Sequence, residues 1–187
     1  MMFDENILDT TISNIIFNYK ISFSNKIHTA GNEDFDVIMN LFNITPELKR
    51  ENRQYWGREL GMCWQRIVTA LCQTRCSNFQ PAIRIGADEP FDLAVGQYAI
   101  DTKYRIGSGD AGTLKKFREN GARIKALGYT PVLLIVRSDN LNAAITACKS
   151  GGWDIYHSQA AFAFIHRETG FNLYNYLFLK KGAFSII

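Results

Sequence analysis

The chain has no long apolar run among its 187 residues. A helix that crosses a bilayer needs about 20 consecutive apolar residues, and no stretch of this sequence approaches that length. The first residues, MMFDEN, are acidic and lack the basic and then apolar segments of a secretory signal. The sequence therefore predicts no membrane partner, and we expect a protein of the cytoplasm.

Cysteine and histidine are also scarce, with four cysteines and three histidines in the whole chain. Cys72 and Cys76 are four residues apart, but no second pair of ligands follows at the spacing of a zinc site. His28, His157 and His166 are scattered along the sequence. We therefore expect free or buried thiols in a reducing compartment.

Neither sign of charge dominates, because 21 Lys and Arg residues stand against 18 Asp and Glu residues and leave a net charge of +3. This balance permits a polyanionic partner without requiring one, since the distribution of charge matters more than its sum. Hydrophobic residues make up 47% of the chain, which contains no internal repeat and no low-complexity segment. The sequence predicts one folded domain over residues 1–187.

Helical patterns fill the first part of the chain. Residues 1–46 are expected to form an N-terminal helical extension, and Thr45 and Pro46 have the N-cap and first-position character of a new helix start. Residues 47–73 carry the strongest helical periodicity, although Gly57 or Gly61 could interrupt it. The apolar stripe of this helix consists of Leu60, Trp64, Ile67, Val68 and Leu71.

Strand patterns dominate the middle of the chain. FQPAIRIG is a short strand candidate, TPVLLIVRSDN is typical of a strand buried on both faces, and WDIYHS predicts another strand. Helices are expected over residues 112–127, within LNAAITACKSGG and in residues 158–187. The helix over 112–127 has an expected buried stripe of Leu114, Phe117, Gly121, Ile124 and Leu127, with Gly128 as its C-terminal glycine. This order predicts an α/β or α+β domain with a central mixed β-sheet flanked by helices.

The segment EPFDLAVGQYAIDTKYRIGSGD places charged residues inside strand-like sequence. Gly96-Gln97 is a natural two-residue turn of type II′. In the resulting hairpin register, Asp92 is expected to face Asp101 directly, with Cβ atoms about 5 Å apart. Two like charges at that distance destabilise the hairpin unless a divalent cation or another group neutralises them.

Lys103 follows Asp101 by two positions, so both side chains are expected on the same face of the strand. The hairpin therefore brings two carboxylates and one ammonium group together. Such a group of charges suits the hydrolysis of a phosphodiester, because a bound metal can hold a phosphate oxygen and lower the pKa of a water molecule. The lysine can stabilise the charge that develops.

Asp92 followed by Asp101-Thr102-Lys103 resembles the signature of the PD-(D/E)XK nuclease superfamily, which includes many restriction endonucleases. The sequence departs from the signature at Pro90-Phe91-Asp92, where one residue separates the proline from the aspartate. The resemblance implies a restriction-endonuclease-like core over residues 47–157, followed by C-terminal helices in 158–187. The tail ETGFNLYNYL also resembles that of ApaLI-like restriction endonucleases.

The resemblance implies Mg²⁺ as the cofactor, with Mn²⁺ able to substitute. Asp92 and Asp101 would hold the metal, Lys103 would assist the attacking water, and Glu59, on the preceding helix, would bind a second metal or water. The alternatives are an ordinary turn or strand-end aspartate at Asp92, a surface ion pair between Asp101 and Lys103, and a solvated helix residue at Glu59. In another register, Asp88 or Glu89 could replace Asp92 as a ligand.

Basic and aromatic residues downstream are candidates for contact with double-stranded DNA. Tyr104 and Arg105 lead into the glycine-rich loop IGSGDAG, whose backbone N–H groups could meet a phosphate. Lys115, Lys116 and Arg118, on the next helix, could contact phosphates without reading sequence. A flexible loop and a solvated basic face are the alternatives.

These observations favour a type II site-specific deoxyribonuclease that acts as a homodimer, since a palindrome cut on both strands calls for two symmetric sites. A repair or junction-resolving nuclease of the same superfamily is one alternative. A non-catalytic DNA-binding protein on the same scaffold is another. The sequence does not indicate which side chains read bases.

Overall fold

In the computed structural model, the described residues are 17 and 35–186. Apart from Phe17, the first 34 residues of the expected N-terminal extension lie outside them, and so does His28. The segment Asp34–Ile187 forms one compact unit by its internal contacts. All the strands and the numbered helices described here belong to this unit.

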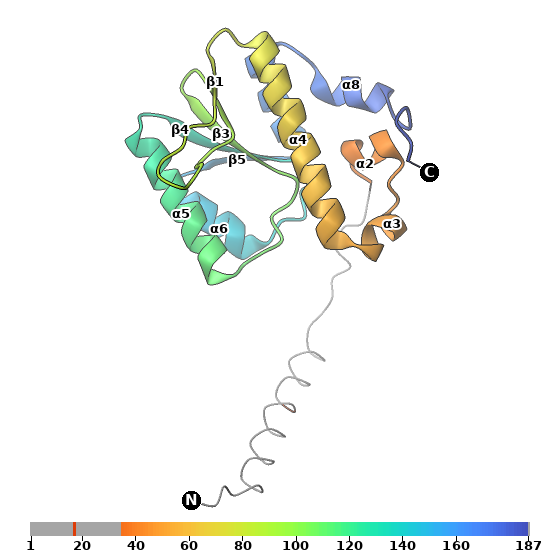
Figure 1. Cartoon of the computed structure of the whole chain (residues 1–187), viewed down its shortest axis with the longest axis horizontal. Helices are drawn as coiled ribbons and strands as arrows, with labels where there is room; N and C mark the ends of the chain where they lie inside the picture. Colours follow the sequence, from red (N-terminus) through yellow and green to blue (C-terminus); the bar gives the residue numbers. More distant parts are fainter. Residues whose placement is uncertain (1–16, 18–34, 187) are drawn as a thin grey trace, which may run out of the picture. The chain divides into compact units, whose positions relative to one another are not determined.

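A five-stranded mixed sheet forms the centre of the unit, as the sequence predicts (Figure 1). The strands run in the spatial order β1-β2-β3-β4-β5. Strands β1, β2 and β3 pair antiparallel, whereas β3, β4 and β5 pair parallel. The strand bounds are Phe79–Pro81 for β1, Leu93–Val95 for β2, Tyr98–Lys103 for β3, Thr130–Ile135 for β4 and Asp154–His157 for β5.

Helices cover both faces of the sheet, with α4 on one side and α5 and α6 on the other (Figure 1). The helix bounds are Val37–Phe42 for α2, Pro46–Glu51 for α3, Arg53–Arg75 for α4, Ala111–Ala126 for α5, Asn142–Ser150 for α6, Gln159–Thr169 for α7 and Leu173–Leu179 for α8. Alternate residues of β4 confirm burial on both faces, because Leu134 belongs to the core under α4 and α7 and Leu133 to the core under α5 and α6.

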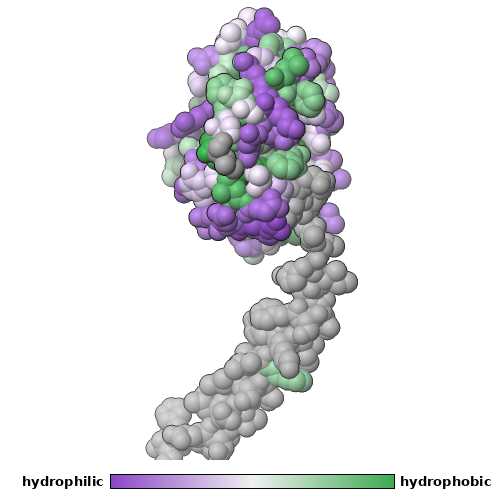
Figure 2. Space-filling view, turned by 90° about the vertical axis from the view of Figure 1, so that its right-hand side faces the viewer, coloured by the Kyte–Doolittle hydropathy of each residue, from purple (hydrophilic) through white to green (hydrophobic). Residues whose placement is uncertain are grey.

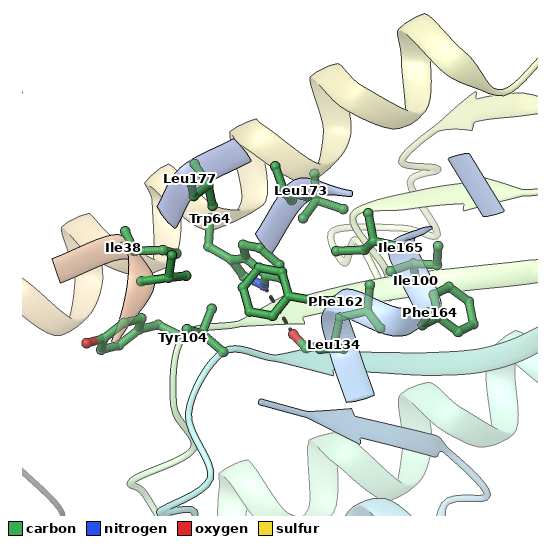
Figure 3. Packing of buried hydrophobic residues seen from close by; sticks show 14 of the residues in the cluster. Ile38, Trp64, Ile100, Tyr104, Leu134, Phe162, Phe164, Ile165, Leu173 and Leu177 are labelled. Atoms are coloured by element: carbon green, nitrogen blue, oxygen red, sulfur yellow. Dashed lines mark hydrogen bonds between the residues drawn. The ribbon is translucent and has the colours of Figure 1, made fainter. Parts of the chain in front are cut away.

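Trp64 is the central side chain of the core between α4 and the sheet (Figure 3). Its indole is fully buried, packs edge-on against Phe162 with ring centroids 5.2 Å apart, and donates a hydrogen bond of 3.3 Å to the Leu134 carbonyl. Because the ring is both buried and hydrogen-bonded, it fixes the rotation of α4 over β3 and β4. That rotation decides which α4 side chains reach the edge of the sheet.

The predicted helix over residues 47–73 is in fact two helices. The break lies at Asn52, whose side chain accepts a hydrogen bond from the Tyr55 N–H and caps α4. Gly57 and Gly61 do not interrupt α4, which continues from Arg53 to Arg75. The Thr45 cap is confirmed, since its hydroxyl accepts from the Leu48 N–H at 3.2 Å.

The later helices agree with the sequence in number and kind. The expected stripe of α5 is buried or half-buried except for Leu127, which follows the helix and is 44% exposed. Gly121 has a packing role, because a Cβ there would lie 2.3 Å from the Gly151 carbonyl oxygen. The close approach of α5 to the end of α6 therefore requires a glycine at this position.

Candidate active site

The hairpin between β2 and β3 has the predicted turn. Gly96 has a φ of 54°, and Gln97 is not among the described residues with positive φ, as a type II′ turn requires. Val95 pairs with Tyr98, Ala94 with Ala99, and Leu93 with Ile100, as the sequence predicts. The turn therefore fixes the register of the strand that carries Asp101 and Lys103.

The next predicted pair, Asp92 with Asp101, is not part of this ladder, and the expectation of direct opposition is wrong. Strand β2 begins only at Leu93, and the Asp92 N–H donates to the Ile100 carbonyl at 2.9 Å. The Asp92 carboxylate instead lies against Thr102. Its Oδ2 accepts hydrogen bonds from the Thr102 N–H at 2.7 Å and from the Thr102 hydroxyl at 2.6 Å.

A glutamine of α4 completes the surroundings of Asp92. Gln65 Nε2 donates to Asp92 Oδ1 at 2.8 Å. Gln65 follows the fully buried Trp64, so it lies beside the part of α4 that packs on the sheet. We did not select Gln65 from the sequence. Its position next to the largest residue of the apolar stripe is the signal that could have identified it.

Asp101 and Lys103 form the second half of the site and lie together, as strand alternation predicts. Lys103 Nζ donates to Asp101 Oδ1 at 2.7 Å and to the Thr102 carbonyl at 3.2 Å. The Asp101 side chain is 13% exposed and that of Lys103 is 36% exposed. The ion pair is thus partly buried, and its lysine side chain is the more exposed partner.

Asp92, Asp101 and Lys103 form one electrostatic group, here called the Asp-Lys site. Burial raises the pKa of Asp92 to about 6, and the charge of Asp101 adds to this effect against the attraction of Lys103. Burial lowers the pKa of Lys103, but the Asp101 and Asp92 charges outweigh it, so the net shift is upward. Lys103 is therefore an ammonium group at neutral pH. Asp92, one of the two carboxylates that act on Lys103, takes up a proton near pH 6.

Cys148 of α6 lies on the α5–α6 side of the sheet, to which the Asp101 and Lys103 side chains point, whereas Gln65, a partner of Asp92, comes from α4 on the opposite side. Burial raises the pKa of its thiol to about 12, and the Asp101 charge contributes in the same direction. The thiol is fully buried and stays neutral at physiological pH. It is therefore a packing residue beside Asp101 and not a nucleophile.

Glu59 does not join this site in the structure. Its carboxylate pairs with Arg58 at 2.9 Å, and its side chain is 39% exposed. Glu59 precedes Gln65 by six residues on α4, which separates the two by about 9 Å along the axis and about 120° around it. The expected acidic residue from the helix is thus absent from the neighbourhood of Asp92, where an amide stands instead.

Asp88 and Glu89 are also engaged elsewhere. Asp88 pairs with Lys116 at 3.3 Å and with Arg123 at 3.2 Å, and Glu89 pairs with Arg84 at 2.9 Å. These contacts tie the loop before β2 to α5. Asp88 and Glu89 therefore do not replace Asp92, whose charge interacts with that of Asp101.

Asp92 and Asp101 are the two carboxylates of the Asp-Lys site that could hold Mg²⁺. Mg²⁺ is usually held by one or two carboxylates together with water and substrate phosphates. Asp92 and Asp101 can supply them, and the repulsion that raises the pKa of Asp92 would be relieved by a cation. Within residues 35–186 there is no group of three or more His, Cys, Asp or Glu side chains that could hold a metal. The structure thus offers no third protein carboxylate.

The predicted DNA contacts differ in their exposure. Tyr104 is only 4% exposed, and its hydroxyl donates to the Asp36 carboxylate, so its expected contact with DNA is not supported by its position. Arg105 is exposed, and its Nε donates to the carbonyl and the carboxylate of Asp139. The burial of Tyr104 follows from the close passage of α4, since a Cβ on Gly61 would lie 3.7 Å from that of Tyr104.

The α5 residues lie on an exposed helix face. Lys115 pairs with Glu119 at 3.6 Å, and Lys116 pairs with Asp88. Arg118 is exposed, and no ion pair is found for it among the described residues. This face is open to a polyanion, although two of its cations already have carboxylate neighbours.

Comparisons with protein-family models, with curated proteins and with solved structures give no significant match. The resemblance to the nuclease superfamily therefore rests on the residues and on the arrangement of the strands. None of the described helices has the length and apolar character needed to cross a membrane.

Proposed function

We propose that this protein is a Mg²⁺-dependent endodeoxyribonuclease of the PD-(D/E)XK kind, acting on double-stranded DNA as a homodimeric type II restriction endonuclease. The observation that carries the proposal is the Asp101–Lys103 ion pair of 2.7 Å on β3, whose charges act on the half-buried carboxylate of Asp92. Two carboxylates and an ammonium in one partly buried group are the parts that metal-assisted phosphodiester hydrolysis needs.

The order of the elements supports the proposal. Helix α4 precedes three antiparallel strands, and α5 then leads to β4, which is parallel to β3. This is the order expected of a restriction-endonuclease-like core over residues 47–157. The Asp-Lys site lies at the end of β3 where β2 no longer pairs with it. A substrate can approach the chain there because the ladder has ended.

Each residue of the site has a distinct role in this proposal. Asp92 and Asp101 would hold Mg²⁺, which supplies a bound water of lowered pKa and an electrophile for a phosphate oxygen. Lys103 places its positive charge where negative charge develops during the reaction. Gln65 and Thr102 orient the Asp92 carboxylate and favour its ionised form.

The decisive experiment is incubation of the purified protein with plasmid DNA and Mg²⁺, followed by sequencing of the fragment ends. Discrete bands with one common end sequence support the restriction enzyme, whereas nicks at branched or distorted DNA support a repair or junction-resolving nuclease. No cleavage with either Mg²⁺ or Mn²⁺, over a range of DNA substrates, would overturn the proposal.

One observation favours a non-catalytic DNA-binding protein as the second candidate. Asp92 already has protein donors on both carboxylate oxygens, and Asp101 Oδ1 has Lys103. These contacts can hold the hairpin without a metal. A melting temperature that does not change with Mg²⁺ or Mn²⁺, together with absence of cleavage, would support this candidate, because a ligand of the folded state raises the melting temperature.

A further inference from the structure

A second group of charged side chains lies beyond the ends of β3 and β4. It comprises Asp36, Lys49, Tyr104, Arg137 and Asp139 and is here called the Lys49 cluster. Tyr104 directly follows β3, and Arg137 lies two residues past β4. Figure 3 shows the Tyr104 ring at the margin of the core, with its hydroxyl pointing away from Trp64.

The two carboxylates of the Lys49 cluster are bound by groups other than Lys49. Asp36 accepts from the Tyr104 hydroxyl, from Arg137 Nη1 at 3.4 Å and from two backbone N–H groups of α2. Asp139 accepts from Arg137 Nε at 2.7 Å and from Arg105 Nε at 3.0 Å. Both aspartates are mostly buried, with exposures of 12% and 18%. The arginines therefore largely neutralise them.

Lys49 is held by neutral groups. Its Nζ donates to the Tyr104 hydroxyl at 2.9 Å, lies 3.6 Å from the Met39 sulfur, and sits 4.7 Å from the centre of the Tyr104 ring. No carboxylate in the described part of the chain lies within ion-pair distance of it. Burial and the charge of Arg137 lower the pKa of Lys49 to about 8, although Asp36, Asp139 and Arg105 also act on it. The ammonium is thus fixed in place but lacks a contact anion.

The place of Lys49 at the end of β3 indicates which anion it would bind. Tyr104, which supports Lys49, directly follows Lys103 of the Asp-Lys site, and its side chain lies on the α4 side of the sheet, opposite to that of Lys103. We propose that the Lys49 ammonium binds a phosphate of the DNA backbone at the end of β3, on the α4 side of the sheet. This inference rests on the proposed nuclease function. Contacts of this kind position the duplex without reading its sequence.

The test compares Lys49→Met with Lys180→Met. Lys180 is a matched control, because its Nζ also lies over a tyrosine ring, at 5.1 Å from the centre of Tyr176. Binding of a labelled duplex by the full chain is measured by fluorescence anisotropy in EDTA at several salt concentrations. Loss of one phosphate contact should reduce the slope of log affinity against log salt by about 0.9. We expect that reduction, with a loss of affinity, for Lys49→Met and neither effect for Lys180→Met.

A second measurement covers the possibility that Lys49→Met disturbs folding. Lys49→Arg retains its charge at pH 9, whereas a lysine with a pKa of about 8 loses it. We expect the affinity of the wild type for DNA to fall between pH 7 and pH 9, and that of Lys49→Arg to fall much less. Equal pH profiles would overturn the inference.

The outcomes separate this inference from the proposed function. Binding and cleavage by the wild type with no difference between Lys49→Met and Lys180→Met would overturn the Lys49 contact alone. Absence of both DNA binding and cleavage by the wild type would overturn the function and the contact together. Binding without cleavage, weakened by Lys49→Met, would support the contact and contradict the nuclease.

Discussion

The Asp-Lys site and the Lys49 cluster lie at the same end of β3 but have net charges of opposite sign. In the first, the charges of two carboxylates act on one ammonium, and one of them, Asp101, contacts it. In the second, Lys49, Arg105 and Arg137 stand against Asp36 and Asp139. The first group would gain from a cation and the second from an anion, which in the proposed nuclease would be a metal ion and a phosphate of the DNA backbone.

The two groups also differ in what their ion pairs do. In the Asp101–Lys103 pair the lysine side chain is 36% exposed, whereas the Arg137 side chain is 6% exposed and links two carboxylates. An exposed charge can act on a substrate, but a buried one mainly fixes its neighbours. We therefore assign chemistry to the Asp-Lys site and support to Arg137.

The largest effect is expected from the Asp-Lys site. In the proposed nuclease, Asp101→Asn and Lys103→Met should each reduce DNA cleavage by about a hundredfold or more, because each removes a charge that would act on the reacting phosphate. Initial rates on plasmid DNA measure this effect. Asp154→Asn is the control, since Asp154 is an exposed aspartate on β5 of the same sheet. Full activity in Asp101→Asn would contradict the assignment of the site.

The next largest effect concerns the stability of the Lys49 cluster. Arg137→Met should lower the free energy of unfolding by about 3 kcal/mol, because it leaves two mostly buried carboxylates without their shared guanidinium. Arg105→Met should cost less than about 1 kcal/mol, because that side chain is 42% exposed. Urea denaturation measures both values. Equal losses would mean that burial does not distinguish the two arginines.

A smaller effect should appear in the pH dependence of stability. The pKa of Asp92 in the folded state is about 6, above its usual value of 3.8, so the folded state binds this proton more tightly than the unfolded state. The contribution of Asp92 to stability is therefore fully present below about pH 4 and is lost as the pH rises through about 6.

This loss should be on the order of 2 kcal/mol, because one pKa unit corresponds to about 1.4 kcal/mol and the side chain is partly solvated. Urea denaturation of the wild type and of Asp92→Asn at pH 4 and pH 7 isolates it. The wild type should lose stability relative to Asp92→Asn as the pH rises, and Mg²⁺ should restore it at pH 7. Identical pH dependence of the two proteins would contradict the buried, repelled carboxylate.

Local sequence signals predicted the hairpin well. The Gly96-Gln97 turn and the alternation of Asp101 and Lys103 depend only on neighbouring residues, so the pattern was sufficient. Asp92 was misplaced because its direction depends on where β2 begins and on Thr102, one strand away. The turn chemistry says nothing about either.

Contacts between distant segments were not predictable in this way. Gln65 reaches Asp92 only because Trp64 fixes the rotation of α4, and a shift of one residue along a helix turns a side chain by about 100°. The Lys49 cluster joins residues 36, 49, 104 and 137, which no periodicity connects. Tyr104 was predicted to contact DNA because the strand pattern does not show that α4 passes over it.

The exposed apolar surface near the C-terminus belongs to neither of the two charged groups. Figure 2 views the side of α2, α3 and α8 and shows hydrophobic patches among hydrophilic residues. The large hydrophobic side chains exposed near the C-terminus are Tyr176, Phe178, Leu179, Phe184 and Ile186. Neither charged group depends on these residues. Substitutions there are therefore suitable for testing self-association without altering the Asp-Lys site.

The smallest effect tests the hydrogen bonds that hold Asp92. Thr102→Val removes the hydroxyl that donates to Asp92 Oδ2 at 2.6 Å but keeps the shape of the side chain and the backbone N–H. A hydrogen bond to a carboxylate favours its ionised form, so its loss should raise the pKa of Asp92 further above 6, by less than about one unit.

A carbon NMR titration of the Asp92 carboxyl measures this shift without relying on catalysis, and the lower limb of the pH–rate profile should move upward by the same amount. Thr130→Val, at the start of β4 in the same sheet, is the control and should leave both unchanged. If the NMR midpoint rises but the pH–rate profile does not, then Asp92 is held by Thr102 as described but its ionisation does not limit the reaction. In that case Asp101 and Lys103 alone would carry the chemistry, and the charge imbalance of the Asp-Lys site would be a feature of stability.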